Sequence, residues 1–170
     1  MTAPAGLPYY FGGFFWSKVA QTSLFMGNSP ARIDDKGRLK LPQSYRQDLE
    51  ARYGRELFLT SLTGEYVRVY PMPVWLDILQ KLTEVAPGHP SRERFLDRVN
   101  YFGDKGELDA QGRVLVPYRL RDAAGMVGEV DVLGKFNYLD VWNHDRFVQQ
   151  RIKDNAFTDD DARALAEFGI

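Results

Sequence analysis

The sequence contains no cysteine and only two histidines. The absence of cysteine excludes disulfide bonds, cysteine-based zinc sites and thiol catalysis, and it favours a reducing compartment. No window approaches about 18 consecutive apolar residues, so the sequence predicts no transmembrane helix and no membrane partner. The apolar segment 7–16 has no basic stretch before it and is interrupted by proline and glycine. We therefore interpret it as a chain extension and not as a signal peptide.

The sequence also lacks the patterns on which common active sites are built. Neither His89 nor His144 has a second histidine or a cysteine three or four residues away, and no phosphate-binding GxxxxGK[ST] loop or strand-borne GxGxxG pattern is present. Asp34 and Asp109 lie in duplicated halves, as the catalytic pair of aspartic proteases does, but no small hydroxyl residue and glycine follow them directly. We therefore predict a protein that is not an enzyme, with no catalytic residues, no metal and no cofactor.

The net charge of −1 does not by itself indicate a nucleic-acid-binding protein. The charge is unevenly distributed, however. Residues 32–46 contain five basic and two acidic residues, residues 104–121 contain four basic and three acidic, and residues 153–170 contain two basic and five acidic. Because salt screens phosphate attraction over about 10 Å, this local excess matters more than the total. The alternative interpretation of residues 32–46 is an ordinary solvated charged loop.

One short motif occurs twice, 75 residues apart: DDKGRLKLP at 34–42 and DAQGRVLVP at 109–117. Gly37 and Gly112 follow polar residues, so we expect them to adopt positive φ in a tight turn. The residues after each arginine predict a short strand, which the proline ends. Asp34 and Asp109 can pair with the arginine or brace the turn backbone, and both readings of the aspartates stay open. For the arginines a surface role is favoured, because nothing apolar requires them there.

The duplication continues beyond the motif. Arg46 matches Arg121 at the same offset, and at an offset of 72 the segments 66–70 and 73–75 match 138–142 and 145–147. Each unit therefore predicts a turn, a strand, a short helix, a strand pair and a helix. Self-similarity of this kind is typical of a fold built from repeats.

Helices are predicted between and after the units. Residues 73–85 form an amphipathic helix with an apolar stripe made of Trp75, Ile78, Leu79 and Leu82. Ser91 is the predicted N-cap of the next helix, whose apolar face carries Phe95, Val99 and Phe102. As a pair these helices suit an interface between subunits or between repeats. Asn143 and Thr158 are the predicted N-caps of two later helices.

The doubled D-x-x-G-R-φ-x-φ-P motif, where φ is apolar, resembles the MraZ family of bacterial transcriptional regulators, within the SpoVT/AbrB-like group of swapped-hairpin DNA-binding proteins. The resemblance covers about residues 25–150 and implies a mainly β protein with helices (α+β). Two AbrB-like repeats would interlock into a split β-barrel with pseudo-two-fold symmetry. The predicted divisions are an N-terminal extension (1–24), the first repeat (25–86), a connecting helix (87–103), the second repeat (104–156) and an acidic C-terminal helix (157–170). Met26 is a candidate start of the family-like chain.

The resemblance implies a cytoplasmic, nucleoid-associated repressor of the division and cell-wall gene cluster. It would act as a ring-like homo-oligomer that binds short direct repeats in double-stranded promoter DNA. The alternative is an AbrB-like antitoxin that binds DNA and a toxin partner. Such antitoxins carry one motif per chain and a disordered tail, whereas this chain carries both motifs and a C-terminal segment with helical periodicity.

The candidate DNA-binding residues are the basic residues in and around the motifs: Arg32, Lys36, Arg38, Lys40, Arg46 and Arg113. The turn residues of the motifs are Asp34, Gly37, Asp109 and Gly112. Because the local charge is +3 in the first motif region and +1 in the second, we predict that the first motif dominates DNA contact and that the second mainly completes the barrel.

Overall fold

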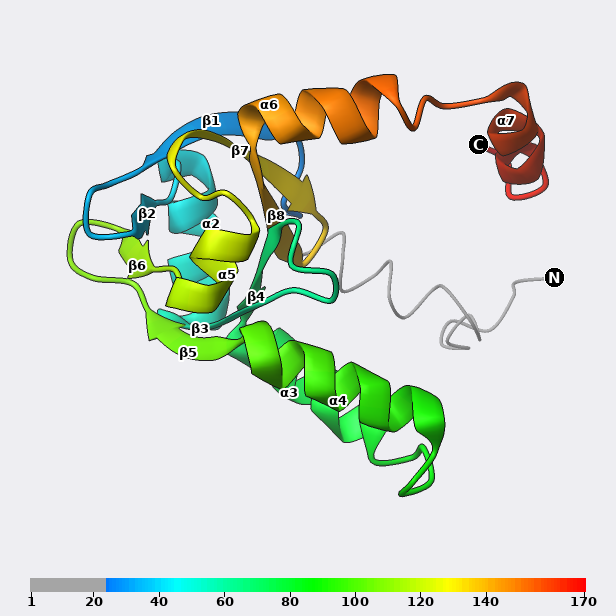
Figure 1. Ribbon diagram of the computed structural model, residues 1–170, viewed down its shortest axis with the longest axis horizontal. Coiled ribbons are helices and arrows are strands. Elements are labelled where there is room, and N and C mark those ends of the chain that lie inside the picture. The colour runs from blue at the N-terminus through cyan, green and yellow to red at the C-terminus, as the bar shows by residue number, and fades with distance from the viewer. Residues whose placement is uncertain (1–23) are drawn as a thin grey trace, which may run out of the picture.

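A computed structural model describes residues 24–170 (Figure 1), so the predicted N-terminal extension lies outside the described residues except for its last position. Eight strands form one antiparallel sheet in the order β5-β3-β4-β8-β7-β1-β2-β6. The strands are β1 (Asn28–Ile33), β2 (Arg38–Lys40), β3 (Glu56–Thr60), β4 (Val67–Pro71), β5 (Asp104–Glu107), β6 (Arg113–Leu115), β7 (Gly128–Lys135) and β8 (Tyr138–Asn143). The end strands β5 and β6 contact each other, so the sheet curls into a nearly closed barrel.

Strand pairing shows that the two repeats are interlocked. The first strand of each repeat pairs with the third strand of the other, β1 with β7 and β5 with β3. The second strands, β2 and β6, pair with each other, as do the fourth strands, β4 and β8. Each repeat therefore depends on strands of the other repeat to form the sheet. This pairing confirms the predicted α+β fold with an interlocked barrel.

The register of these ladders locates a pseudo-two-fold axis. Leu39 lies opposite Val114 in the β2–β6 pair, and Arg68 lies opposite Asp140 in the β4–β8 pair. Each of these is a pair of equivalent positions in the two repeats, at sequence offsets of 75 and 72. Only residues beside a two-fold axis face their own equivalents, so the axis passes between both pairs.

The main core is built by both repeats together. Helices α2 (Gln43–Tyr53) and α5 (Tyr118–Ala123) cover it, burying Tyr45, Leu49 and Leu120. The barrel interior is filled by apolar strand residues of both halves, including Leu39, Val67, Val69, Val114, Val132, Leu139 and Val141. Phe25 also belongs to this core, edge-on to Tyr45 with ring centroids 5.9 Å apart. The packed fold thus includes the residue before the candidate start at Met26.

A helical hairpin projects from one side of the barrel (Figure 1). It consists of α3 (Met72–Leu82) and α4 (Pro90–Phe102) and buries a second cluster of Phe58, Tyr70, Trp75 and Val99. The predicted N-cap Ser91 is wrong. His89 is the cap, and its Nδ1 accepts from the Ser91 N–H at 3.2 Å. Pro90 has a φ suited to the first helical position, so the helix begins two residues earlier than a cap at Ser91 would place it.

The chain ends in a helical arm that runs away from the barrel (Figure 1). The arm comprises α6 (His144–Phe147), a π-helical segment η1 (Val148–Lys153) and α7 (Asp159–Ala166). Asn143 caps α6, and Thr158 caps α7 in a reciprocal capping box with Asp161, so both predicted caps are confirmed. Every helix within residues 24–170 is too short or too polar to span a lipid bilayer.

Candidate nucleic-acid interface

The first motif forms a tight loop between β1 and β2 that is organised by one carboxylate. Asp34 Oδ1 accepts from the backbone N–H groups of Lys36 (3.0 Å) and Arg38 (2.9 Å), and Oδ2 accepts from Arg38 Nε at 2.7 Å. The Gly37 N–H donates to the Asp34 carbonyl, and Gly37 has a φ of +79°. The Arg38 backbone N–H, with its side chain, holds the pKa of Asp34 below its ordinary value. The carboxylate thus fixes both the turn and the arginine.

The second motif repeats this geometry. Asp109 Oδ1 accepts from the N–H groups of Gln111 and Arg113, both at 2.9 Å, and Oδ2 accepts from Arg113 Nε at 2.8 Å. Gly112 has a φ of +75°. The Arg113 backbone N–H is the largest cause that lowers the pKa of Asp109 to about 2. Both readings of the aspartates therefore hold at once, because each one pairs with its arginine and braces the turn.

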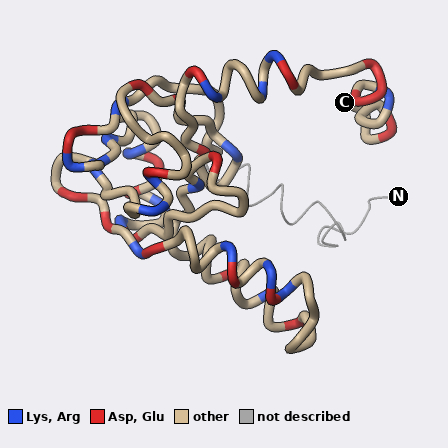
Figure 2. The backbone as a smooth tube through the Cα atoms, viewed as in Figure 1, with Lys and Arg blue, Asp and Glu red and all other residues tan. Residues whose placement is uncertain are grey.

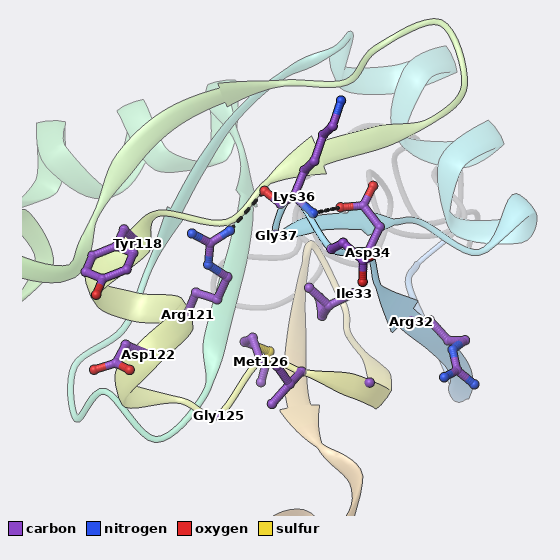
Figure 3. Close-up of a pocket in the computed structure, with 13 residues that line it drawn as sticks. Arg32, Ile33, Asp34, Lys36, Gly37, Tyr118, Arg121, Asp122, Gly125 and Met126 are labelled. Atoms are coloured by element: carbon purple, nitrogen blue, oxygen red, sulfur yellow. Dashed lines mark hydrogen bonds between the residues drawn. The ribbon is translucent and has the colours of Figure 1, made fainter.

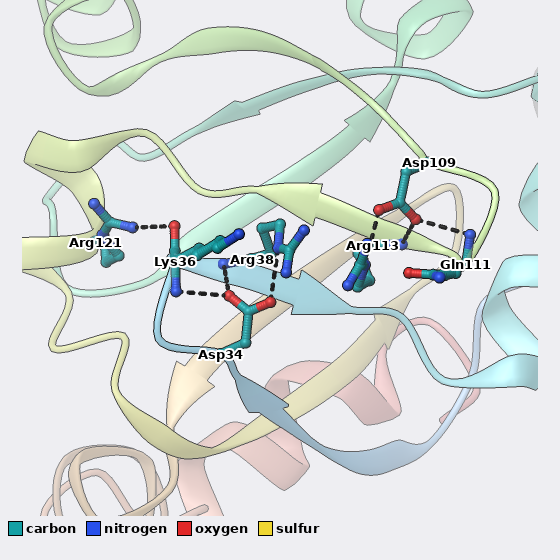
Figure 4. A network of polar contacts seen from close by, with 7 residues as sticks. All are labelled: Asp34, Lys36, Arg38, Asp109, Gln111, Arg113 and Arg121. Carbon is teal, nitrogen blue, oxygen red and sulfur yellow. Dashed lines mark hydrogen bonds and ion pairs between the residues drawn. The ribbon is translucent and has the colours of Figure 1, made fainter.

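The paired strands β2 and β6 bring the two motifs onto one surface (Figure 4). Leu39 and Val114 face each other in the core, so the flanking residues point to the opposite, outer face. That outer face carries Arg38, Lys40, Arg113 and Leu115. In both arginines Nε is occupied by an aspartate, and among residues 24–170 the terminal nitrogens have no hydrogen-bond partner. Each guanidinium is held in place with its two terminal amino groups unused.

Arg32 completes this surface from β1. A hollow of about 710 Å³ is lined by four of the predicted DNA-binding residues, Arg32, Arg38, Lys40 and Arg113, together with Ile33, Asp34, Asp35 and Gln111. We call these four basic residues the motif face. With the two aspartates the lining carries a net charge of +2. Figure 2 shows the mixture of acidic and basic residues at this end of the barrel, the end opposite to α7.

Lys36 lies at the tip of the first loop, beside a different hollow of about 600 Å³ that α5 helps to line (Figure 3). Its side chain is exposed and extends away from Arg121, while its carbonyl oxygen accepts from Arg121 Nη1 at 3.0 Å. Lys36 therefore offers an exposed charge next to the motif face without lining its hollow.

Arg46 does not line the hollow of the motif face. Its Nη2 donates to the carbonyl of Ala110 at 2.9 Å, and its Nε lies 3.3 Å from Glu50 Oε1. Arg121 makes a similar contact with the first loop, at the Lys36 carbonyl, which is one motif position later than the carbonyl that Arg46 holds. The sequence prediction did not include Arg121 in the candidate site. The match of Arg46 to Arg121 at the motif's own offset was the signal that the two arginines share a role.

The groups that this site offers for binding are positively charged side chains. Within residues 24–170 no group of three or more His, Asp or Glu side chains is placed to hold a metal ion. His89 caps α4, and His144 Nδ1 lies 2.8 Å from Asp131 Oδ2. The hydrogen bond to Asp131, and the charge of that carboxylate, raise the pKa of His144. Both histidines are thus accounted for by local structure.

The profile of one protein family matches the chain in two segments, residues 24–98 and 104–168, and its description reads "MraZ protein, putative antitoxin-like". The two segments are the two interlocked repeats, so the match agrees with the duplication seen in the sequence.

Full-length relatives carry the same similarity. "Transcriptional regulator MraZ" of Acidobacterium capsulatum is 45% identical over 147 residues, which is 86% of this chain and 100% of the relative. Proteins of the same name from Koribacter versatilis and Chromobacterium violaceum are 40% and 31% identical, over 86% and 73% of this chain and 100% and 84% of theirs. The resemblance noted from the two motifs is confirmed.

Proposed function

The chain belongs to the MraZ family of transcriptional regulators, which is not a family of enzymes, and on that premise we propose that it binds double-stranded DNA through the motif face. The observation that carries this proposal is the paired outer surface of β2 and β6, where aspartates hold two arginines whose terminal amino groups have no hydrogen-bond partner among residues 24–170. A two-stranded antiparallel ribbon fits the major groove of B-DNA, and a bidentate arginine is the commonest reader of guanine.

The predicted DNA-binding residues divide between two tasks. Arg38 and Arg113 are oriented before binding, so they are suited to reading base edges. The exposed side chains of Arg32, Lys36 and Lys40 are suited to phosphate contacts, which set the register of the protein on the duplex. Arg46 is assigned instead to the support of the second loop.

Several copies of this modest surface are needed for firm binding. A chain of net charge −1, whose motif face lines a hollow of net charge +2, attracts DNA weakly, whereas linked faces on one ring-like homo-oligomer act at high effective concentration. We propose that such a ring binds short direct repeats in the promoter of the division and cell-wall gene cluster and represses it. The protein then acts in the cytoplasm, on the nucleoid.

The experiment is a binding titration of the protein against the DNA upstream of its own gene, by fluorescence anisotropy at several salt concentrations, with sites of one, two and three repeats. A ring that uses two to four loops is expected to release roughly four or more counterions from the DNA. Each phosphate that the protein neutralises adds about 0.9 to the steepness with which log K falls against log salt concentration. Removing one repeat is then expected to cost far more than a proportional share of the affinity. Affinity that does not depend on repeat number would contradict the role of the ring.

One observation favours a second candidate function, an antitoxin that binds DNA and a toxin partner: the words "antitoxin-like" in the family description. Two features of the chain oppose it. Both motifs lie in one polypeptide, and the C-terminal segment forms the capped helix α7 in place of an extended tail. A small toxin gene beside this gene, with a product that co-purifies with the protein, would support the antitoxin, whereas a neighbouring cell-wall gene cluster would support the regulator.

A further inference from the structure

Each motif loop is held by an arginine from the other repeat, and this crossed support has a consequence for DNA binding. Arg121 on α5 of the second repeat donates Nη1 to the Lys36 carbonyl at 3.0 Å (Figure 4). The N–H of Val116, which precedes α5, donates to the Gly37 carbonyl at 3.0 Å. The tip of the first loop therefore has two hydrogen bonds to the second repeat.

The glycine of the first loop is shaped to this contact. A Cβ on Gly37 would occupy the space that the Arg121 guanidinium fills. Gly37 is thus required twice, once for its φ of +79° and once to admit the arginine. The guanidinium lies beside the loop backbone, where its planar fork is well suited to hold the Lys36 carbonyl.

The second loop has the reciprocal arrangement. Arg46 on α2 of the first repeat donates Nη2 to the Ala110 carbonyl at 2.9 Å, and the Leu41 N–H donates to the Gly112 carbonyl at 3.0 Å. A Cβ on Gly112 would come within 2.6 Å of Arg46 Cδ. Arg46 is itself held by Glu50, whereas the position equivalent to Glu50 in the second repeat is Gly125. Among residues 24–170, Arg121 therefore supports its loop without a carboxylate partner of its own.

We propose that Arg121 and Arg46 are positioning residues, each of which orders the DNA-binding loop of the opposite repeat. The inference rests on the proposed function for its effect on affinity, but the ordering itself does not depend on DNA. Surface loops open locally at low free-energy cost, and a loop that is ordered before binding avoids that cost in the complex. If the first loop dominates DNA contact, Arg121 of the second repeat matters more to binding than Arg46 of the first.

The first test is amide hydrogen exchange of the full chain without DNA. Arg121→Ala is expected to speed exchange of the Lys36, Gly37 and Arg38 amides about ten-fold, the scale of removing one hydrogen bond to a charged donor, while the second loop stays protected. Arg46→Ala is expected to speed exchange of the amides of residues 111–113 while the first loop stays protected. Arg119→Ala is the matched control, because it removes a cation from the same helix at a side chain that lies over Tyr101. Exchange of the first loop that is unchanged in Arg121→Ala would overturn the proposal.

The second test separates positioning from direct phosphate contact. Arg121→Ala is expected to weaken binding to the upstream DNA several-fold with an unchanged salt slope, and Arg121→Lys is expected to weaken it as well, because lysine keeps the charge and loses the planar fork. A slope reduced by about 0.9, with affinity restored by lysine, would identify Arg121 as a phosphate contact and overturn its positioning role in DNA binding. If exchange changes as expected but the parent protein does not bind DNA, the crossed support stands and the proposed function fails.

Discussion

The two motif loops have the same backbone and a different charge. Their aspartate–arginine distances are 2.7 and 2.8 Å, and their turn hydrogen bonds agree to within about 0.1 Å. Three of the basic residues around the first loop have no basic counterpart in the second, because Arg32, Lys36 and Lys40 correspond to Glu107, Gln111 and Leu115. The residues that shape the loop are thus duplicated, while most of the residues that would attract phosphate are not.

This difference separates the roles within the motif. Asp34 and Asp109, with the glycines that follow, build a rigid turn in either electrostatic setting. The cations around the turn then decide how strongly it attracts DNA. Arg113 lies on the same outer face as Lys40, directly across the β2–β6 pair, so the second repeat contributes one arginine to a surface otherwise supplied by the first.

The largest expected effect concerns the axis where the repeats meet. Arg68 donates Nε and Nη2 to the two oxygens of Asp140 at 2.7 and 2.9 Å, and the Asp140 side chain is only 7% exposed. Burial alone would lower the pKa of Arg68, but the hydrogen bonds and charge of Asp140 raise it. Arg68→Ala leaves a buried carboxylate unpaired, so we expect a loss of about 3–5 kcal/mol in the free energy of unfolding by denaturant titration.

The exchange Arg68→Asp with Asp140→Arg is the control for that change, because equivalent positions face each other across the axis and the reversed pair can form in the same place. It is expected to recover most of the stability that Arg68→Ala removes. A loss below about 1 kcal/mol for Arg68→Ala would show that the pair behaves as a surface ion pair.

The next effect compares the two motif arginines. Arg38→Ala is expected to weaken binding to the upstream DNA by about 1–3 kcal/mol, the scale of one bidentate base contact, while the melting temperature is kept. Arg113→Ala is expected to cost more in stability than in affinity relative to Arg38→Ala. Equal losses of affinity with unchanged melting temperatures for both variants would remove the asymmetry between the repeats. Arg163→Ala on α7, which carries an exposed side chain paired with Asp160, is the control for loss of charge alone.

A charge exchange sharpens the same comparison. Lys36→Gln with Lys40→Leu gives the first loop the residues of the second at these two positions. The double variant is expected to flatten the dependence of log K on log salt concentration by about 1.8, which is about 0.9 for each phosphate that the protein no longer neutralises. Gln111→Lys is expected to raise the slope by up to about 0.9 if the second loop reaches the DNA backbone. An unchanged slope in the double variant would mean that neither lysine binds phosphate.

The smallest effect is the acid response of the loops. The pKa of Asp109 is lowered from 3.8 to about 2, so its contribution to the loop is fully present above about pH 4 and is lost as the pH falls through about 2. The pKa of Asp34 is also lowered, and the first loop is expected to respond in the same direction. Carboxyl chemical shifts followed by NMR would measure both. A midpoint for Asp109 at 3.8 would contradict the hydrogen bonds assigned to it.

The repeats and the turns could be predicted because they depend on local spacing, and the barrel was implied by the family resemblance that the doubled motif carries. Gly37 and Gly112 mark the turns, and the short apolar runs after the motif arginines become the paired strands β2 and β6. The role of Arg46 could not be predicted in this way. Its contact with Ala110 exists only because the repeats exchange strands, which places a helix of one beside the loop of the other.

The N-cap of α4 shows a more local limit. Ser91 has the residue type of a cap, but Pro90 precedes it with a backbone already suited to the helix, and His89 supplies the acceptor. A choice between neighbouring capping residues depends on backbone geometry as well as residue type. The domain boundaries and the division of DNA contacts between the repeats stay predictions.

The most direct measurement is amide hydrogen exchange of the full chain with and without the DNA upstream of its gene. We expect new protection at residues 36–40 and 111–115, stronger in the first segment, with α3, α4 and α7 unchanged. Protection on α3 and α4 with none on β2 and β6 would contradict the claim that the motif face binds DNA.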